Sequence, residues 1–117
     1  MNSILISVKK LLGIAEECED FDTDLIMYIN SVLFALGQMG VGPENGYMIS
    51  DKTNTWEEFL QDAVKAAAVK AYLAVKVRLL GFDPPQSSTT MEALKNTAAE
   101  MEWRLNCEFD TPKKSSS

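Results

Sequence analysis

The sequence predicts an all-α protein, a small bundle of about four helices around one long central helix, with an extended loop or short β piece between the second and third helices. Apolar residues recur at three- and four-residue spacing in four segments, and the glycines and prolines fall between those segments. The 117 residues, 46% of them apolar, fit one domain with its own core. We expect this domain to span residues 1–110 and a flexible tail to follow it, residues 111–117.

The central helix is expected over residues 56–80. Thr55 and Glu58 have capping-box spacing at its start, and Gly81 with the prolines that follow ends it. Gln61-Asp62 allows a break between a short leading turn and the main helix. A helix that is apolar almost all round is expected to have neighbours packed on several faces. Its apolar residues form two lines, Leu60, Val64, Ala67, Ala71, Val75 and Val69, Leu73, Val77, Leu80.

A short amphipathic helix is expected over residues 2–12, closed by Gly13. Lys9 and Lys10 lie near its end, and we expect both to face away from the core, where positive charge suits the helix dipole. The apolar residues that follow the helical spacing are Ile4, Val8, Leu11 and Leu12.

A second helix is expected to begin with Asp22 or Thr23 as its N-cap and to end at Gly40 and Gly42. Its apolar residues form one stripe that faces the core. The stripe consists of Leu25, Ile29, Val32, Leu36 and Met39, with Ile26 and Leu33 beside it.

An acidic stretch, residues 16–24, precedes this helix. Asp20, Asp22 and Asp24 resemble the first ligands of a calcium loop, but Leu25 occupies the position at which such a loop requires glycine. We interpret the stretch as a solvated helix start that suits the positive end of the dipole. The alternative is an electrostatic docking face.

Residues 40–55 form the longest break between helices. Asn45-Gly46 predicts a turn, and residues 47–49 would suit a short extended piece, which needs a partner segment to form a sheet. Exposed loops of this length are often functional.

A rigid connector is expected over residues 82–90, followed by a last helix over about 89–106. Thr89 and Glu92 again have capping-box spacing. Apolar residues at alternating intervals of three and four form a seam suited to an adjacent helix. The seam consists of Met91, Leu94, Ala98, Met101 and Leu105.

The composition argues against an enzyme. The chain has no histidine, which removes the commonest general base and the commonest metal ligand. Cys18 and Cys107 have no metal or redox spacing, so we expect reduced thiols, with a bridge between them as the alternative. The glycines of residues 40–46 follow a helix and have the wrong spacing for a dinucleotide fingerprint. We expect no catalytic site, no metal and no cofactor.

The charge is distributed unevenly along the chain. Residues 1–60 carry a net charge of −7 and residues 61–117 carry +1, within a total of −6. An acidic protein is a poor candidate for wrapping nucleic acid. No apolar run reaches the roughly 18 residues that a membrane-spanning helix needs, and no signal peptide is recognised.

Basic and aromatic residues supply the candidate surface features. Lys65 and Lys76 lie within about 20° of each other on a helical wheel and mark one polar strip, near which Arg78 also lies. This strip is either a narrow solvent face or a functional surface, which would be a subunit contact or a lining that faces an anionic partner. Trp56 and Trp103 are typical core or interface anchors, and we expect Trp103 at an interface because its helix already has a seam to bury.

Three stretches carry a resemblance to a known family. They are KKLLGI (Lys9–Ile14) with FDTDLIMYINSVLFALGQMGVGP after the acidic run, GYMISDKTNTWEEFL (Gly46–Leu60), and VKAYLAVKVRLLGFDPP (Val69–Pro85) before a helix with MEWRLN (Met101–Asn106). In these stretches, over about residues 2–110, the chain resembles the small helical head–tail connector, or adaptor, proteins of tailed phages. Gly81 departs from the pattern, because it adds a flexible residue before the connector.

The resemblance implies a structural virion protein that binds the portal protein as a ring of about twelve copies, extends the DNA channel and docks the next neck or tail protein. It implies a place in the virion neck after assembly in the host cytoplasm, passage of DNA without specific binding, and no membrane contact. The expected partner contacts are Tyr47, Ile49, Trp56, Phe82, Asp83, Pro84, Pro85, Trp103 and Phe109, and the expected channel-facing residues are Lys65, Lys76 and Arg78.

Two other interpretations remain open from the sequence. The first is a small soluble helical module for protein interaction or assembly, without a role in a virion. The second is a helical nucleic-acid-binding protein, which the net charge of −6 disfavours.

Overall fold

The computed structural model describes residues 3–81 and 86–116, and the side chains of residues 3–81 and 86–107. Within these ranges the chain forms five helices: α1 (Ile4–Leu11), α2 (Asp22–Gln38), α3 (Trp56–Phe59), α4 (Ala63–Leu80) and α5 (Ser88–Ser116). The described residues contain no strand, only an isolated antiparallel bridge between Ser3 and Thr55. The predicted all-α class is confirmed.

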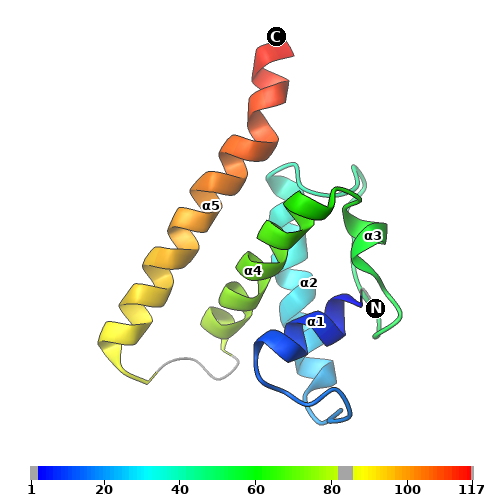
Figure 1. The fold of residues 1–117 in the computed structure, drawn as a ribbon, viewed down its shortest axis with the longest axis vertical. Coiled ribbons are helices and arrows are strands. Elements are labelled where there is room, and N and C mark those ends of the chain that lie inside the picture. Colours follow the sequence, from blue (N-terminus) through cyan, green and yellow to red (C-terminus); the bar gives the residue numbers. More distant parts are fainter. Residues whose placement is uncertain (1–2, 82–85, 117) are drawn as a thin grey trace.

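The helix α4 lies at the centre of the fold (Figure 1). It contacts α1 and α2 on one side and α5 on the other. Burying a Leu, Ile or Val side chain stabilises the fold by about 1.5–3 kcal/mol, so the apolar stripes of these helices provide most of the driving force. The largest part of the core comes from Ile4, Leu5, Val8, Leu25, Ile29, Val32, Leu33, Leu36, Val69, Tyr72, Leu73 and Val77.

Only one of the two apolar lines of α4 is buried. Val69, Leu73 and Val77 lie in the core, whereas Val64 is 81% exposed and the alanines 67 and 71 are exposed with it. The expectation of neighbours on several faces is confirmed, because α4 contacts α1, α2 and α5, but the middle of the line that contains Val64 is not buried. Leu60 and Val75, at the two ends of this line, are half-buried, whereas Val64, Ala67 and Ala71 between them are exposed.

A buried ion pair ties the end of α1 to the start of α2. The Lys9 side chain is only 2% exposed. Its Nζ lies 2.9 Å from Oδ1 of Asp22, an otherwise unpartnered buried oxygen, and donates to the backbone oxygen of Glu16 at 3.0 Å. The expectation that Lys9 faces away is wrong, because the loop after α1 carries acceptors to it, whereas Lys10 is exposed as expected.

The same ion pair explains how α2 begins. The N-cap of α2 is Phe21, which makes no side-chain cap, so neither Asp22 nor Thr23 is the N-cap that the sequence predicted. The Asp22 carboxylate is directed to Lys9 instead. Asp22 and Asp24 still lie in the first turn, where negative charge suits the helix dipole.

The loop between α2 and α3 is held by the side chain of Asn30. Its Nδ2 donates to the backbone oxygen of Ile49 at 3.0 Å, and its Oδ1 accepts from the Ile49 N–H at 2.8 Å. The backbone of Ile49 is therefore hydrogen-bonded to a side chain, and residues 47–49 form no strand, in contrast to the short β piece that we considered. The turn expected at Asn45-Gly46 is present, with Gly46 at φ 88°.

The local signals of the central segment are confirmed. Thr55 and Glu58 form the capping box of α3, and residues 60–62 interrupt the helix where a break was expected. Asp62 then caps α4 by accepting from the backbone N–H groups of its first turn. Gly81, at φ 142°, ends α4 in a conformation that side chains rarely adopt.

The helix α5 is longer than the sequence predicted. It runs to Ser116 instead of ending near residue 106, and Figure 1 shows its C-terminal part extending beyond the other helices. The predicted end followed the end of the apolar seam, but backbone hydrogen bonding can continue a helix without a seam. The boundary between a domain and a tail at residue 110 stays a prediction.

The ion pair predicts the effect of Asp22→Asn, which removes the charge and keeps the side-chain shape. We expect the free energy of unfolding to fall by about 2–4 kcal/mol, because the buried ammonium of Lys9 loses its counter-charge. Urea denaturation followed by circular dichroism measures this loss. The matched control is Asp24→Asn in the same turn, which is exposed and should cost less than about 1 kcal/mol. Equal losses in the two variants would contradict this role of the ion pair.

Candidate assembly surfaces

The predicted seam of α5 packs against α4. Ala98 and Leu105 are buried, and the other three seam residues are half-buried. The small side chain of Ala98 permits close approach of the two helices. The seam is therefore the attachment surface of α5, as the heptad-like spacing predicted, although one chain does not bury it completely.

A polar cluster holds α5 on α4 beside the seam. The Tyr72 hydroxyl donates to Oε2 of Glu102 at 2.7 Å, and Nζ of Lys76 lies 3.5 Å from the same oxygen. Burial of the ring and the hydrogen bond to a negatively charged acceptor raise the pKa of Tyr72 well above its ordinary value. Tyr72 therefore remains a neutral donor, and Glu102 is satisfied by groups from α4.

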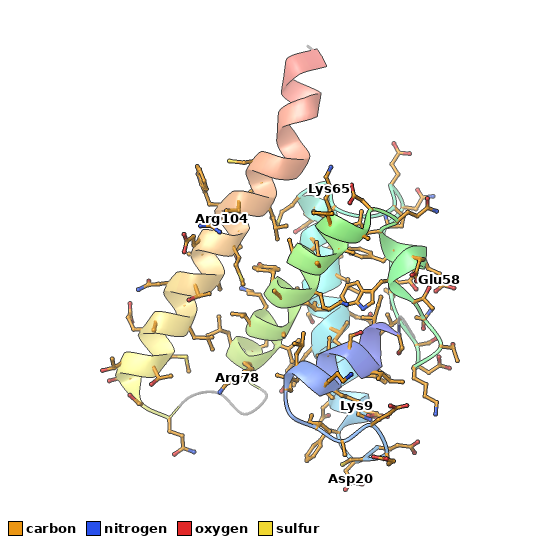
Figure 2. The ribbon with its side chains drawn as sticks, in the orientation of Figure 1. Lys9, Asp20, Glu58, Lys65, Arg78 and Arg104 are labelled. Atoms are coloured by element: carbon orange, nitrogen blue, oxygen red, sulfur yellow. The ribbon has the colours of Figure 1, made fainter. Side chains whose placement is uncertain are left out.

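Next to this cluster α4 and α5 leave an open groove of about 300 Å³. Its floor is apolar and built from small or flexible side chains. The charged residues that line it are Lys65 on α4 and Arg104 on α5, both labelled in Figure 2. The apolar residues that line it are Val64, Ala68, Ala71, Met101 and Leu105.

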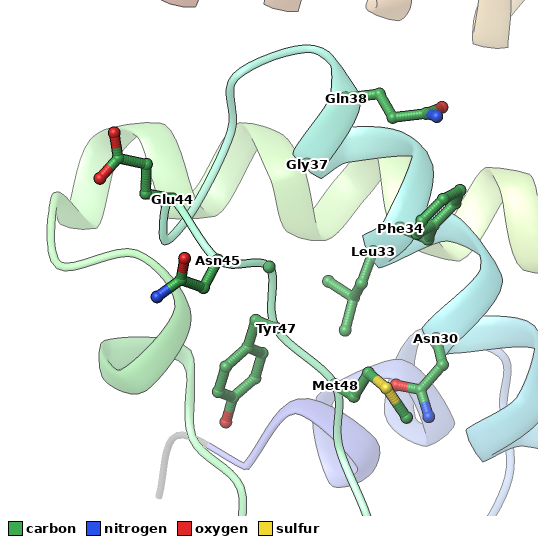
Figure 3. A pocket seen from close by; sticks show the side chains of 10 residues that line it. Asn30, Leu33, Phe34, Gly37, Gln38, Glu44, Asn45, Tyr47 and Met48 are labelled. Carbon is green, nitrogen blue, oxygen red and sulfur yellow. The ribbon is translucent and has the colours of Figure 1, made fainter.

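A second apolar surface lies on another side of the molecule. Between the second half of α2 and residues 44–48 there is a hollow of about 520 Å³ (Figure 3). Phe34 and Met48 line it and are 69% and 70% exposed. In Figure 3 the helix α4 lies behind the hollow, and no residue lines both the hollow and the groove between α4 and α5.

Lys65, Lys76 and Arg78, three of the four basic residues of α4, do not form one cluster. Lys76 is engaged by Glu102, and Lys65 lines the groove at the other half of the helix. Figure 2 shows Lys65 and Arg78 at opposite ends of α4. The expectation that these residues face a DNA channel stays a prediction.

The aromatic and loop residues expected at partner contacts have different positions. Ile49 and Trp56 are buried in the chain's own core, where the Trp56 Nε1–H donates to Oγ of Ser7 at 3.0 Å. Tyr47 is half-buried, whereas Trp103 is 67% exposed on α5. Phe82, Asp83, Pro84 and Pro85 lie outside the described residues, as does the side chain of Phe109.

Sequence reasoning missed the most exposed apolar residues. Val64 was counted among the packed lines of α4, and Phe34 and Met48 were not considered as surface candidates. For Phe34 a signal existed, because it lies off the apolar stripe of α2. An aromatic residue off the buried stripe of an amphipathic helix is expected on the surface.

The Tyr47 hydroxyl links the loop to α3 by donating to Oε1 of Glu58 at 2.6 Å. Partial burial is the main cause that raises the pKa of Tyr47 to about 12, and the hydrogen bond to Glu58 adds to it. The same hydrogen bond lowers the pKa of Glu58. The loop edge of the hollow is thus fixed to the capping box of α3.

The described residues were also compared with the requirements of a membrane-spanning helix and of a metal site. None of the described helices has the length and hydropathy needed to cross a membrane. Among the same residues, no group of three or more potential ligands is placed to hold a metal ion. What the described part of the chain offers is a small helical scaffold with two exposed apolar surfaces, which is typical of a protein that assembles with others.

Comparison with known protein families supports this class. The family model described as phage connector protein matches residues 4–112. The chain therefore belongs to the phage connector protein family, and it is a structural phage protein that interacts with other components of the particle. Neither the curated proteins nor the solved structures gave a match to this chain. The resemblance seen in the sequence is confirmed at the level of the family.

The polar cluster predicts the effect of Tyr72→Phe. We expect the free energy of unfolding to fall by about 1–2 kcal/mol, because Glu102 loses its shortest hydrogen bond. Urea denaturation measures the change. The matched control is Glu100→Gln on α5, which removes an exposed ion pair with Arg104 and should cost less than about 0.5 kcal/mol. If the loss of unfolding free energy in Tyr72→Phe is no larger than that in the control, the cluster does not hold α5 on α4.

The raised pKa of Tyr47 predicts a loss of stability at alkaline pH. Between pH 10 and pH 12 the unfolded chain releases this proton while the folded chain keeps it, so stability falls as pH rises through this window. Urea midpoints across the window measure the slope in the wild type and in Tyr47→Phe, which should have the shallower slope. Tyr72 adds to the slope in both proteins, so the difference between them isolates Tyr47. Identical slopes would contradict the assignment.

Proposed function

We propose that this protein is a head–tail connector that binds the portal protein at the capsid vertex as a ring of about twelve copies. The ring extends the DNA channel and provides the docking surface for the next neck or tail protein. The protein is assembled in the host cytoplasm and resides in the virion neck. Membership of the phage connector protein family supports this proposal at the coarser level.

The observation that carries the proposal is the presence of two unlike apolar surfaces. One is the groove between α4 and α5, and the other is the Phe34–Met48 edge of the hollow on α2. A subunit of a ring needs two different surfaces, because each copy contacts two neighbours by a heterologous contact that closes. Exposed aromatic and methionine side chains are enriched at such contacts.

The charge of the chain suits a channel through which DNA slides. With a net charge of −6, the protein lacks the basic surface that would retain nucleic acid by counterion release. Lys76 is occupied by Glu102 on the neighbouring helix. We propose that the channel wall includes Lys65, Lys76 and Arg78, which reduce its negative charge and do not bind DNA specifically.

The contacts with other proteins are proposed for several separate positions. Trp103 lies exposed on α5, and α5 extends beyond the other helices in Figure 1. The connector Phe82–Pro85 and Phe109 are included from the family resemblance. Tyr47 is included because its loop borders the exposed hollow.

The test is co-assembly with the portal protein encoded by the same genome. We expect light scattering to show a complex and negative-stain microscopy to show a ring of this protein on the portal. The matched pair of variants is Trp103→Ala and Lys95→Ala, both exposed on α5. Trp103→Ala should weaken portal binding at least tenfold, a loss of about 1.4 kcal/mol, whereas Lys95→Ala should not.

A failure to bind at high micromolar concentration would contradict the proposal. A well-behaved monomer in that experiment would favour the alternative, a small helical assembly module without a role in the neck.

A further inference from the structure

We propose that copies of this chain associate head to tail, with the Phe34–Met48 surface of one copy seated in the α4–α5 groove of the next. This inference rests on the proposed ring and names its self-contact. The Phe34–Met48 surface is the exposed edge formed by these two side chains on α2 and its following loop, and the α4–α5 groove is the one lined by Val64, Ala68 and Met101.

The two surfaces fit each other in size and chemistry. The floor of the groove is made of small side chains, Ala68 and Ala71, beside the 81% exposed Val64. Such a floor accepts a large side chain from outside, and its open volume is about 300 Å³. Phe34 and Met48 are large, apolar and mostly exposed. Seating them in the groove removes apolar area from water on both partners, at about 25 cal/mol per Å².

Charge complementarity argues for a second copy as the occupant. Glu44 lines the hollow at the first surface, and Lys65 and Arg104 line the groove. Opposite charges around two apolar surfaces steer them together and fix their register.

The present partner of Arg104 does not prevent this contact. Arg104 pairs with Glu100 at 2.9 Å, but both side chains are more than half exposed. An exposed pair one helical turn apart is worth only about 0.3–0.5 kcal/mol, so the guanidinium can exchange partners at little cost.

The positions of the surfaces determine the kind of assembly. They are formed by different elements and share no lining residue, so each copy uses its groove toward one neighbour and its Phe34–Met48 surface toward the other. A contact of this kind does not end at a dimer, and it produces a ring if the rotation closes. The structure therefore assigns the self-contact to two specific surfaces.

The experiment is thiol cross-linking between two single-cysteine variants, Phe34→Cys and Ala68→Cys, each in a Cys18→Ser, Cys107→Ser background. The two variants are treated with a short bis-maleimide separately and as an equal mixture, in the free protein at near-millimolar concentration. We expect several-fold more covalent dimer in the mixture than in either variant alone. Met48→Cys with Ala71→Cys provides a second pair if one variant folds poorly.

The matched control replaces Ala68→Cys by Asn96→Cys, an exposed position on α5 that does not line the groove. This mixture should give only background dimer. If either variant alone gave as much covalent dimer as the mixture of Phe34→Cys and Ala68→Cys, the contact would be symmetric or random, and the proposal would be overturned.

The same pair is tested on the portal complex, which separates this inference from the proposed function. A ring on the portal without the Phe34–Ala68 cross-link, together with none in the free protein, refutes this contact and leaves the connector function standing. A cross-link in the free protein without portal binding supports the contact and refutes the portal proposal.

Discussion

The fold depends on one constraint, which is that α4 must serve as the packing partner of α1, α2 and α5 at once. Val69, Leu73 and Val77 are buried in the same core cluster as residues of α1 and α2. Tyr72 provides both apolar area and the hydroxyl that donates to Glu102 of α5. Its alanine-rich sequence favours helix and allows close approach on several sides. Because the chain provides neighbours for only some of these sides, Val64, Ala67 and Ala71 stay exposed.

The other helices and the loop between α2 and α3 are held in place by specific contacts. Lys9 and Asp22 join α1 to α2 inside the protein, and Asn30 fixes the loop through the backbone of Ile49. This half of the molecule therefore presents Phe34 and Met48 on a firmly held edge. By contrast, the described contacts of α5 with α4 include its apolar seam and the cluster of Tyr72, Lys76 and Glu102. The two exposed apolar surfaces thus lie on parts that are held by independent contacts.

The sequence predicted what depends on local signals. The capping box at Thr55 and the break before Asp62 were predicted because caps and breaks are read from neighbouring residues, and the seam of α5 because helical spacing identifies a face. The burial of Lys9 was not predicted, because its acceptors come from the loop after α1 and from α2. Helical periodicity within α1 does not indicate where these two segments lie. The exposure of Val64 was missed for a related reason: an apolar line shows that burial is favourable and does not show whether the same chain or another one provides it.

The central claim is that the Val64 line of α4 is open in the single chain and is covered when copies assemble. Thiol labelling of Val64→Cys in a background without Cys18 and Cys107 tests it most directly, with Asn96→Cys as the reference. In the free protein, we expect Val64→Cys to be labelled as fast as the reference. In the assembled ring, we expect labelling of Val64→Cys to be at least tenfold slower, while labelling of the reference is unchanged. Slow labelling in the free protein, or unchanged labelling in the assembly, would contradict it.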